Sequence, residues 1–387
     1  MIPYNRQSIS EEDIDAVVAV LRSSHLTQGP EVAAFEAALC SYCHAPFAVT
    51  TTNGTAALHL ALLALDVGPG DRVWTTPNTF LASANAALYC QAEVDFVDID
   101  YASGNLDPHQ LTIKLETAKR VHQLPKALIV VHFGGNACQM EAIKAVTAHY
   151  GIALIEDAAH ALGSSYSNGE KIGSCHYADV TTFSFHPIKS ITTGEGGAIL
   201  TRDSGLAAKA RLLASHGVVR GDPDRQRDEP WQYQQQLLGY NLRLSDIAAA
   251  LGHSQLQRLD RFLQRRRQLA QRYHHALQAL PVDPLTPEAE LHHSAWHLYP
   301  LHLQEEGHIR QRATLVNQLL AAGIATQVHF IPVHTQPWYQ KLGFHWGDFP
   351  EAERHYHTTI SLPLFPDMGF DQQEYIIATL SRLLKTI

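Results

Sequence analysis

The sequence predicts an α/β fold, with a large domain built on a mainly parallel sheet and a smaller C-terminal α/β domain. First, short β-rich runs alternate with helical patterns through the first two thirds of the chain. Second, a long helical pattern begins near Ser245 and is followed by a shorter set of helical and strand-like segments. Third, 387 residues are enough for two domains or one large one.

The strand candidates of the large domain are short runs rich in β-branched and aromatic residues. The first two, FAVTT and DRVWTTP, precede the helical patterns TAALHLALLAL and TFLASANAALYC. Five more follow them: EVDFVDID, KALIVVHF, GIALIED, DVTTFSF and GGAILT. Such alternation is typical of a parallel sheet covered by helices on both faces, and ligands of these sheets bind at the carboxyl ends of the strands.

The helical pattern from Ser245 to about Leu280 is expected to bridge the two domains. Its basic run Arg-Arg-Arg, residues 265–267, is most simply a solvated helix face. WHLYPLHL and IATQVHFI are the strand candidates of the smaller domain. We therefore place the large domain at residues 1–250, including the N-terminal segment, and the bridging helix with the small domain at 251–387.

The bulk composition excludes several function classes. A formal charge of −9 and a pI near 6.2 argue against nucleic acid or an anionic membrane as a partner. The N-terminus lacks the pattern of a signal peptide, and no apolar run has the length of a membrane span. Five cysteines without disulfide-framework spacing are consistent with a reducing cytoplasm, which is the expected location.

Two motif matches are better explained by local structure. Cys-x-x-Cys-His at residues 40–44 matches the haem attachment pattern, but EVAAFEAALCSYC predicts an amphipathic helix with Phe35, Leu39 and Tyr42 inward. Asn-Gly-Thr at residues 53–55 matches a glycosylation acceptor, but a chain without a secretion signal would not meet the enzyme.

Lys189 stands in the run TTFSFHPIKSITTGEGG, where its neighbours are mostly apolar or small. Lysine is rarely buried, and a lone lysine in such a run is usually a strand-end residue whose ammonium group reaches water. In a partly dry pocket, however, the amine loses some of its preference for the charged form and can attack a carbonyl. Lys189 is therefore a candidate nucleophile if the chain supplies the rest of a site.

Three other features could supply it. Asp157 ends the GIALIED strand, where a side chain can meet a ligand, although a turn-forming role is equally compatible. The first N–H groups of the helix that begins near Thr55 could bind phosphate, although simple helix capping explains one such turn. Phe80 stands early in the next helix, where core packing is the ordinary role of an aromatic residue.

Together these parts fit a phosphorylated pyridine aldehyde, pyridoxal 5′-phosphate (PLP). The amine of Lys189 would condense with the aldehyde, and Asp157 would keep the ring nitrogen protonated. The helix start would hold the phosphate with the help of Ser184, and the aromatic ring of the next helix would cover the pyridine face. The predicted cofactor-binding set is thus Thr55, Ala56, Phe80, Asp157, Ser184 and Lys189.

The whole chain resembles the DegT/StrS family of sugar aminotransferases, which are PLP-dependent transferases with the aspartate aminotransferase type of fold. The resemblance is carried by LTQGP, NGTAAL, PNTF, VHFGG, IEDAAHALGSSY, FSFHPIK, TTGEGG, GYNLRLSDIAAALG and VHFIPVH. The branch of the family that serves pseudaminic acid biosynthesis is the most similar, through IPYNRQSISEEDIDAVVAVL, SAWHLYPLHL, GDFPEAERHY and SLPLFP.

The resemblance implies that Lys189 bonds to the cofactor and that Asp157 is the partner of its ring nitrogen. It also places His160 near the phenolic oxygen of the cofactor. It assigns Asn241 to the phosphate of the neighbouring subunit's cofactor, which implies a homodimer with shared active sites. One departure concerns the phosphate turn, where close relatives often have serine and this chain has Ala56.

Matching positions line the nucleotide-sugar pocket of relatives, and they are Tyr4, Leu26, Thr27, Gln28, Gly29, His329, Phe330 and Ile331. From spacing alone, His329 and His334 would point to opposite faces of a regular strand, so a metal-chelating pair is not expected and no metal is predicted. Ordinary loop histidines and substrate contacts remain equally compatible with the sequence.

We therefore predict an enzyme that uses PLP to transfer an amino group from L-glutamate to a UDP-linked 4-keto-6-deoxy-N-acetylhexosamine. The specific substrate expected is UDP-2-acetamido-2,6-dideoxy-β-L-arabino-hex-4-ulose, aminated at C4 in pseudaminic acid biosynthesis. The alternatives are an aminotransferase for another nucleotide 4-keto-sugar and a non-catalytic PLP-binding regulator. A sugar dehydratase of the same fold has histidine in place of the lysine, so Lys189 argues against it.

Overall fold

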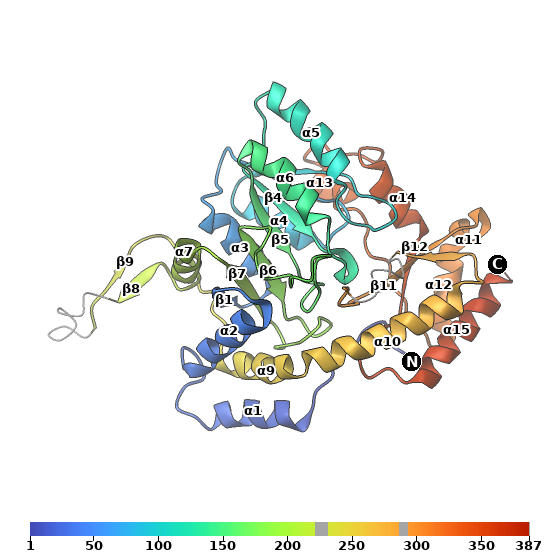
Figure 1. The fold of residues 1–387 in the computed structure, drawn as a ribbon, viewed down its shortest axis with the longest axis horizontal. Coiled ribbons are helices and arrows are strands. Elements are labelled where there is room, and N and C mark those ends of the chain that lie inside the picture. The colour runs from blue at the N-terminus through green and yellow to red at the C-terminus, as the bar shows by residue number, and fades with distance from the viewer. Residues whose placement is uncertain (221–230, 286–292, 387) are drawn as a thin grey trace.

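The computed structural model describes residues 1–220, 231–285 and 293–386, and its centre is a seven-stranded sheet (Figure 1). The strand order is β1-β7-β6-β5-β4-β2-β3. The pairings from β3 to β6 are parallel, whereas β7 is antiparallel to both of its neighbours. The strands are β1 (Phe47–Thr51), β2 (Arg72–Thr75), β3 (Glu93–Phe96), β4 (Ala127–Val131), β5 (Ala153–Asp157), β6 (Val180–Ser184) and β7 (Gly197–Thr201).

All seven predicted strands of the large domain are present, and the mainly parallel sheet is confirmed. Helices cover both of its faces and form two separate apolar cores with it. One face packs α2 (Pro30–Cys43), α5 (Pro108–Arg120), α6 (Met140–Tyr150) and α9 (Asp246–Gln257). The other face packs α3 (Gly54–Ala64), α4 (Leu81–Tyr89) and α7 (Ser204–Ala214).

The C-terminal part has an antiparallel sheet of order β10-β11-β12 and its own apolar core. Its strands are β10 (Val282–Pro284), β11 (Tyr299–Leu303) and β12 (Thr359–Leu362). Its helices are α11 (Glu306–Arg310), α12 (Arg312–Ala321), α13 (Pro337–Gln340), α14 (Pro350–Thr358) and α15 (Phe370–Leu384). The remaining elements are α1 (Glu11–Leu21), the 3₁₀ turns η1 (Phe133–Gly135) and η3 (Val333–Thr335), and the hairpin strands β8 (Val218–Arg220) and β9 (Tyr233–Gln235).

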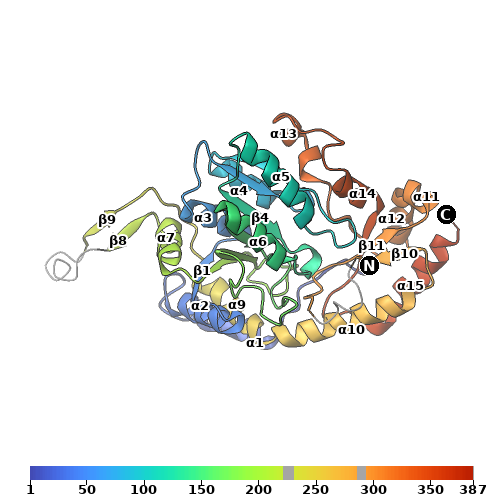
Figure 2. The same ribbon diagram turned by 45° about the horizontal axis from the view of Figure 1, so that its top comes forward.

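The bridging helix is two helices, α9 and α10 (Leu259–Leu277), which run on from one another beneath both parts of the molecule (Figures 1 and 2). Ser245 caps α9 by accepting the N–H of Ala248, so the predicted start is correct. The break lies at Arg258, whose φ of −103° and ψ of 0° depart from regular helix geometry. Among the described residues, no helix is long and apolar enough to cross a membrane.

The prediction of a solvated basic face at residues 265–267 is wrong for Arg266. This side chain is 1% exposed and donates to the backbone oxygens of Trp296 and Leu364 and to the side chain of Asn5. Burial lowers the pKa of Arg266 to about 10, and the carbonyl oxygens compensate the lost hydration of the guanidinium. The helical pattern alone could not reveal this role, because the acceptors come from distant segments.

The second correction concerns IATQVHFI, residues 324–331, which do not form the predicted strand. Within this segment only Ile324 and Gln327 make isolated bridges, to Ile2 and Ser361. The segment instead runs irregularly from the small sheet toward the large one, where the Phe330 N–H donates to the Asn78 side chain at 3.2 Å. It thereby brings polar and aromatic side chains to the carboxyl ends of the central strands.

Candidate active site

A cavity of about 960 Å³ lies at the carboxyl ends of the central strands. Its size is in the upper range of small-molecule sites, which allows for a cofactor and a substrate together. The C-terminal part and the N-terminal segment close its other side. Nine predicted site residues line it: Tyr4, Thr55, Phe80, Asp157, His160, Ser184, Lys189, His329 and Phe330.

Lys189 lies in the loop between β6 and β7, with its side chain partly buried in the cavity wall. Burial lowers the pKa of its amine to about 8, and the negative charge of Asp157 opposes this shift. A substantial fraction of the amine is therefore neutral near neutral or slightly basic pH, the form that attacks a carbonyl.

Asp157 is the last residue of β5, and its carboxylate is held from two sides. Ser83 Oγ donates to Asp157 Oδ2 at 2.6 Å, and the Ala159 N–H donates to Oδ1 at 3.2 Å. Ser83 is in turn 2.7 Å from the hydroxyl of Thr79, another residue of the cavity wall. Among the described residues, no ion pair joins Asp157 to Lys189. The two side chains therefore line the same cavity without bonding to one another.

The start of α3 approaches β6 and β7 very closely. A Cβ atom at Gly54 would lie 2.8 Å from Cβ of Ser184, and one at Gly197 would lie 2.6 Å from the backbone carbon of Asn53. Glycine at both positions therefore lets the helix N-terminus and the Ser184 hydroxyl share one corner of the cavity. The first N–H groups of a helix have no intrahelical acceptor, so this corner suits an anion.

The structure argues against Ala56 as a phosphate ligand. Its N–H donates to Oδ1 of Asn53 at 2.8 Å, and Ala56 does not line the cavity. Asn53 is the N-cap of α3, and an N-cap side chain satisfies an N–H group of the first turn. The N–H groups of Gly54 and Thr55, which precede the capped one, are better placed for a ligand.

A wall of buried histidines faces the strand ends. The rings of His160 and His297 lie 4.3 Å apart, and His160 also faces the ring of Phe330 at 6.1 Å. Burial lowers the pKa of His160 and His297 well below the ordinary value, and that of His329 to about 3. Nδ1 of His160 accepts the Gly134 N–H at 3.3 Å, so this neutral ring carries its proton on Nε2.

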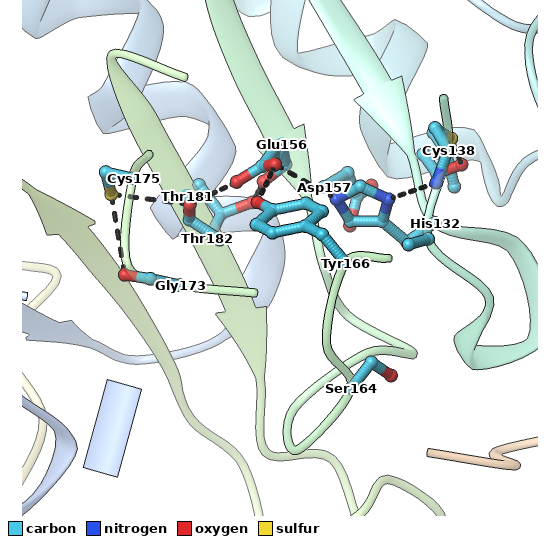
Figure 3. Close-up of polar contacts among 12 residues, drawn as sticks. His132, Cys138, Glu156, Asp157, Ser164, Tyr166, Gly173, Cys175, Thr181 and Thr182 are labelled. Carbon is cyan, nitrogen blue, oxygen red and sulfur yellow. Dashed lines mark hydrogen bonds and ion pairs between the residues drawn. The ribbon is translucent and has the colours of Figure 1, made fainter. Parts of the chain in front are cut away.

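The opposite face of β5 carries a different polar cluster (Figure 3). Glu156 is fully buried and accepts hydrogen bonds from the hydroxyls of Tyr166 and Thr181, the latter at 2.5 Å. His132 Nε2 lies 3.3 Å from the same carboxylate. Burial raises the pKa of Glu156, but the contacts with His132, Thr181 and Tyr166 outweigh it and lower the pKa overall. Glu156 does not line the cavity.

The remaining predicted residues lie away from the cavity of their own chain. Residues 26–29 form a largely exposed loop held by Asp246, which accepts the Gly29 N–H at 2.8 Å and donates its own N–H to Leu26. Ile331 is 48% exposed beside Phe330. Asn241 is exposed and pairs with Ser215 near the base of the β8–β9 hairpin. The residues outside the cavity are Leu26, Thr27, Gln28, Gly29, Ala56, Asn241 and Ile331.

Several cavity residues were not predicted from the sequence. The polar ones are Asn53, Thr79, Thr182, His186, Glu195, His297 and Gln327. Thr79 could have been found with Ser83, because the two stand four apart in the helical pattern TFLASANAALYC; Ser83 does not line the cavity but links Thr79 to Asp157. His297 gave no such signal, since it is two residues before the strand β11 and its position depends on the distant partner His160.

Comparison with known proteins agrees with this geometry. The sequence profile of the DegT/DnrJ/EryC1/StrS aminotransferase family matches residues 7–381. The chain belongs to this family. As a member, it is a PLP-dependent aminotransferase of nucleotide sugars.

Two curated relatives match this aminotransferase over its whole length. The spore coat polysaccharide biosynthesis protein SpsC of Bacillus subtilis is 40% identical over 389 residues, covering 99% of this chain and 97% of the relative. A UDP-4-amino-4,6-dideoxy-N-acetyl-beta-L-altrosamine transaminase of Campylobacter jejuni is 39% identical over 389 residues, covering 100% and 98%. Two such relatives at nearly equal identity leave the sugar to be decided.

Solved structures confirm the aspartate aminotransferase type of fold. Helicobacter pylori PseC, an aminotransferase involved in the biosynthesis of pseudoaminic acid, superposes with a TM-score of 0.91 at 31% identity and 100% coverage of both chains. The sugar aminotransferase Spr1654 of Streptococcus pneumoniae in its PMP form gives 0.92 at 30% identity, also with 100% coverage of both.

The residues of this aminotransferase fit the family's cofactor. An amine of lowered pKa, a carboxylate and a helix N-terminus line one cavity, and these are the groups that suit an aldehyde, a pyridinium nitrogen and a phosphate. The close approach at Gly54 and Gly197 leaves the phosphate corner open to backbone N–H groups, where a Cβ would intrude.

Proposed function

We propose that this aminotransferase transfers the amino group of L-glutamate to C4 of UDP-2-acetamido-2,6-dideoxy-β-L-arabino-hex-4-ulose, a step of pseudaminic acid biosynthesis. The full-length similarity to the Campylobacter altrosamine transaminase carries this proposal, and the similarity to PseC supports it. The equal similarity to SpsC favours a second candidate, in which the same chemistry acts on another nucleotide 4-keto-sugar.

Lys189 and Asp157 are the residues we propose for the chemistry. PLP, when bound, supplies an aldehyde for the donor nitrogen and a pyridine ring that takes up the electron pair released at the donor α-carbon. Lys189 Nζ first holds the cofactor and, once displaced by the donor, takes the proton from that α-carbon. In the second half-reaction the same amine returns a proton to C4 of the sugar. The lowered pKa of Lys189 suits both transfers.

Asp157 keeps a proton on the ring nitrogen through its negative charge, and Ser83 fixes the orientation of the carboxylate. Thr55 and Ser184, with the first N–H groups of α3, would hold the phosphate, and the ring of Phe80 would cover the pyridine face. His160 is proposed to donate its Nε2 proton to the phenolic oxygen, a direction that the Gly134 contact on Nδ1 supports.

The sugar side of the cavity is proposed to consist of Tyr4, His329 and Phe330. The rings of Tyr4 and His329 lie 5.7 Å apart, and both rings reach the cavity from outside the central sheet. Neutral rings suit an uncharged hexose, because they offer apolar faces and hydrogen-bonding edges without an unpaired charge.

We further propose a homodimer with shared active sites. Asn241, Ile331 and the loop at residues 26–29 lie outside the cavity of their own chain, which is compatible with a role at the neighbour's site. Mixing Lys189→Ala protein with Asn241→Asp protein should then restore one working site per heterodimer. If verified heterodimers stay inactive, Asn241 does not act across the interface.

The domain division remains a proposal as well. Residues 1–250 would form the cofactor-binding domain with the large sheet, and residues 251–387 would comprise the rest of the bridging helices and the small sheet. The supporting observation is that β1 to β7 fall within residues 47–201, whereas β10 to β12 fall within residues 282–362. Limited proteolysis that cuts first near residue 250 would support this boundary, whereas a first cut between α9 and α10 would move it to Arg258.

The decisive experiment incubates the protein with L-glutamate and each 4-keto-sugar and identifies the product by mass spectrometry. We expect amination of the UDP-linked L-arabino sugar in preference to its D-xylo epimer. A preference for the D-xylo epimer or for a dTDP-linked sugar would establish the second candidate. Absence of any glutamate-dependent change in the bound cofactor would instead indicate a non-catalytic regulator.

A further inference from the structure

Two histidines behind the cavity wall form a hydrogen-bonded chain that ends on it. His302 Nε2 lies 2.9 Å from His355 Nδ1, and His355 Nε2 lies 2.9 Å from the backbone oxygen of His329. A carbonyl oxygen only accepts, so His355 carries its proton on Nε2 and accepts on Nδ1. His302 must then donate from its own Nε2. The hydrogen bonds therefore run in one direction, from His302 through His355 to the His329 carbonyl, and both rings are neutral.

The hydrogen-bonded pair of His302 and His355 is buried, so water cannot replace these hydrogen bonds. His355 is fully buried and His302 is 4% exposed. Burial lowers the pKa of His355 to about 4 and that of His302 to about 3, which agrees with two neutral rings. A buried carbonyl or imidazole that loses its partner pays the full cost of its desolvation.

The receiving carbonyl belongs to the irregular segment that was expected to be a strand. Apart from the single bridge of Gln327 to β12, residues 327–330 are held by individual contacts. Gln327 exchanges two backbone hydrogen bonds with Ser361, and the side chain of His329 meets Ser361 Oγ at 2.9 Å. His355 Nε2 donates to the His329 carbonyl and so supplies the donor that a regular strand ladder would have provided.

The other end of this hydrogen-bonded series, His302, contacts the part of the molecule that contains the large sheet. Tyr101, which follows β3, stacks on His302 with ring centroids 4.1 Å apart and an interplanar angle of 15°. The guanidinium of Arg354 lies 3.9 Å from the centroid of the Tyr101 ring, and the Tyr101 hydroxyl lies 3.1 Å from Thr358 Oγ1. The cavity wall is therefore connected through His302 and His355 to a segment of the other part.

We propose that His355, oriented by His302, is a positioning residue for the keto-sugar: it fixes the His329–Phe330 segment so that these rings form the sugar-facing wall. The inference rests on the proposed function, because it assigns this wall to the nucleotide sugar. His355 touches neither Lys189 nor Asp157, and it does not line the cavity. Its loss should therefore weaken sugar binding and spare the reaction with the amino donor.

Two variants separate the hydrogen bond from the volume of the ring. Glutamine at position 355 places an amide nitrogen about where Nε2 lies and can still donate to the carbonyl, whereas asparagine is too short. We expect His355→Asn to raise KM for the keto-sugar, and the Kd of UDP-N-acetylglucosamine used as a binding probe, by about tenfold. His355→Gln should stay within about threefold of wild type. The conversion of the bound cofactor by L-glutamate alone, followed by absorbance, should change little in either.

His308 provides a matched control. It is 4% exposed, and its Nε2 lies 2.8 Å from the Leu384 carbonyl in the C-terminal core, away from the cavity. His308→Asn should cost thermal stability comparable to that lost in His355→Asn but leave KM and the Kd of the probe unchanged. If His355→Asn proves unstable, His302→Phe removes only the orienting donor and should give the same split with a smaller rise in KM.

The outcomes are distinct. Unchanged sugar affinity in His355→Asn and His302→Phe, or an equal slowing of the glutamate reaction, overturns the positioning role. A similar rise of KM in His308→Asn also overturns it, because general destabilisation would then explain the effect. A wild-type protein that reacts with glutamate but binds no UDP-linked sugar contradicts the proposed substrate instead, since His355 is intact in it.

Discussion

Two consecutive carboxylates at the end of β5 have opposite surroundings. Asp157 lines the cavity, where Ser83 and a backbone N–H hold it and Lys189 shares the same space. Glu156 points to the other face, where hydroxyl donors and a histidine surround it in a fully buried cluster (Figure 3). Because side chains alternate along a strand, one residue step separates a group open to a ligand from one closed by the protein.

The comparison shows that burial of a carboxylate does not by itself identify a catalytic group. Glu156 is the more deeply buried of the two, and its pKa is clearly perturbed. Its acceptor sites, however, are occupied by side chains of the same fold. Asp157 is also nearly buried, but it borders a cavity that also holds an amine of lowered pKa. We expect substitutions on the two faces to separate activity from stability.

The largest effect is expected on the cavity face, at Lys189. Lys189→Ala removes both the covalent link to the cofactor and the proton-transferring amine, so turnover should fall by about four orders of magnitude. The cofactor should still bind through its phosphate. In the wild-type protein, borohydride reduction should attach the cofactor to the peptide that contains Lys189, as mass spectrometry can show. A label on any other peptide would falsify the assignment.

Asp157→Asn should be the next most severe change. A neutral amide cannot keep the ring nitrogen protonated, and the loss of one charge-stabilising group costs on the order of 10² to 10³ in rate. Cofactor content should remain near that of the wild-type protein, since the phosphate corner is unchanged. Steady-state turnover and the absorbance of bound cofactor measure the two quantities. Near-normal turnover would remove Asp157 from its role.

Much of the cavity face was predictable, because its residues stand at the ends of strands whose patterns are strong. Asp157 was found from its strand-end position and Lys189 as a lone lysine in a mostly apolar run, both together with the family resemblance, and both line the cavity. For Ala56 the sequence could not show that the neighbouring Asn53 accepts its N–H and that the residue does not line the cavity.

Of the histidines in and behind the cavity wall, His160 and His329 were predicted, but three others were not. His297, His302 and His355 depend on partners from distant segments, and the expected strand at residues 324–331 is irregular. The buried Arg266 has the same cause, since it binds carbonyl groups far away in the sequence. Periodicity reports which face of an element is apolar, but it does not report which polar group a tertiary contact will satisfy.

On the other face, Glu156→Leu should affect stability more than chemistry. The change leaves the donors of His132, Tyr166 and Thr181 without their acceptor, which should lower the free energy of unfolding by about 3–5 kcal/mol. Glu156→Gln retains an acceptor oxygen and should cost less. Chemical denaturation measures both. The turnover of the folded fraction should stay close to wild type, and a loss as large as that of Asp157→Asn would show that the two faces are not separable.

The pH dependence of cofactor capture should distinguish the same two carboxylates. The neutral amine of Lys189 attacks the aldehyde, so covalent uptake by the apoprotein should rise about tenfold per pH unit below its pKa. Uptake should level off near pH 8, the value to which burial lowers that pKa. Since the charge of Asp157 raises the Lys189 pKa, Asp157→Asn should move the plateau to lower pH. Glu156→Gln should leave it in place. Stopped-flow absorbance at several pH values gives the profile.

The smallest and most closely matched test compares two hydroxyl-to-carboxylate hydrogen bonds, one on each face. Ser83 donates to Asp157 at 2.6 Å, and Thr181 donates to Glu156 at 2.5 Å. Both hydroxyls are buried, so each bond to a charged group should be worth about 1.5–3 kcal/mol. The two bonds therefore differ mainly in which carboxylate they hold.

Ser83→Ala should let the Asp157 carboxylate turn away from the ring nitrogen, so turnover should fall by about three- to tenfold while cofactor content is kept. Thr181→Val keeps the shape of its side chain and should lower the free energy of unfolding, with turnover near wild type. Parallel measurements of turnover and urea unfolding decide the matter. If both variants lose activity equally, the cluster around Glu156 also controls the geometry of Asp157, and the division of β5 into a catalytic and a structural face fails.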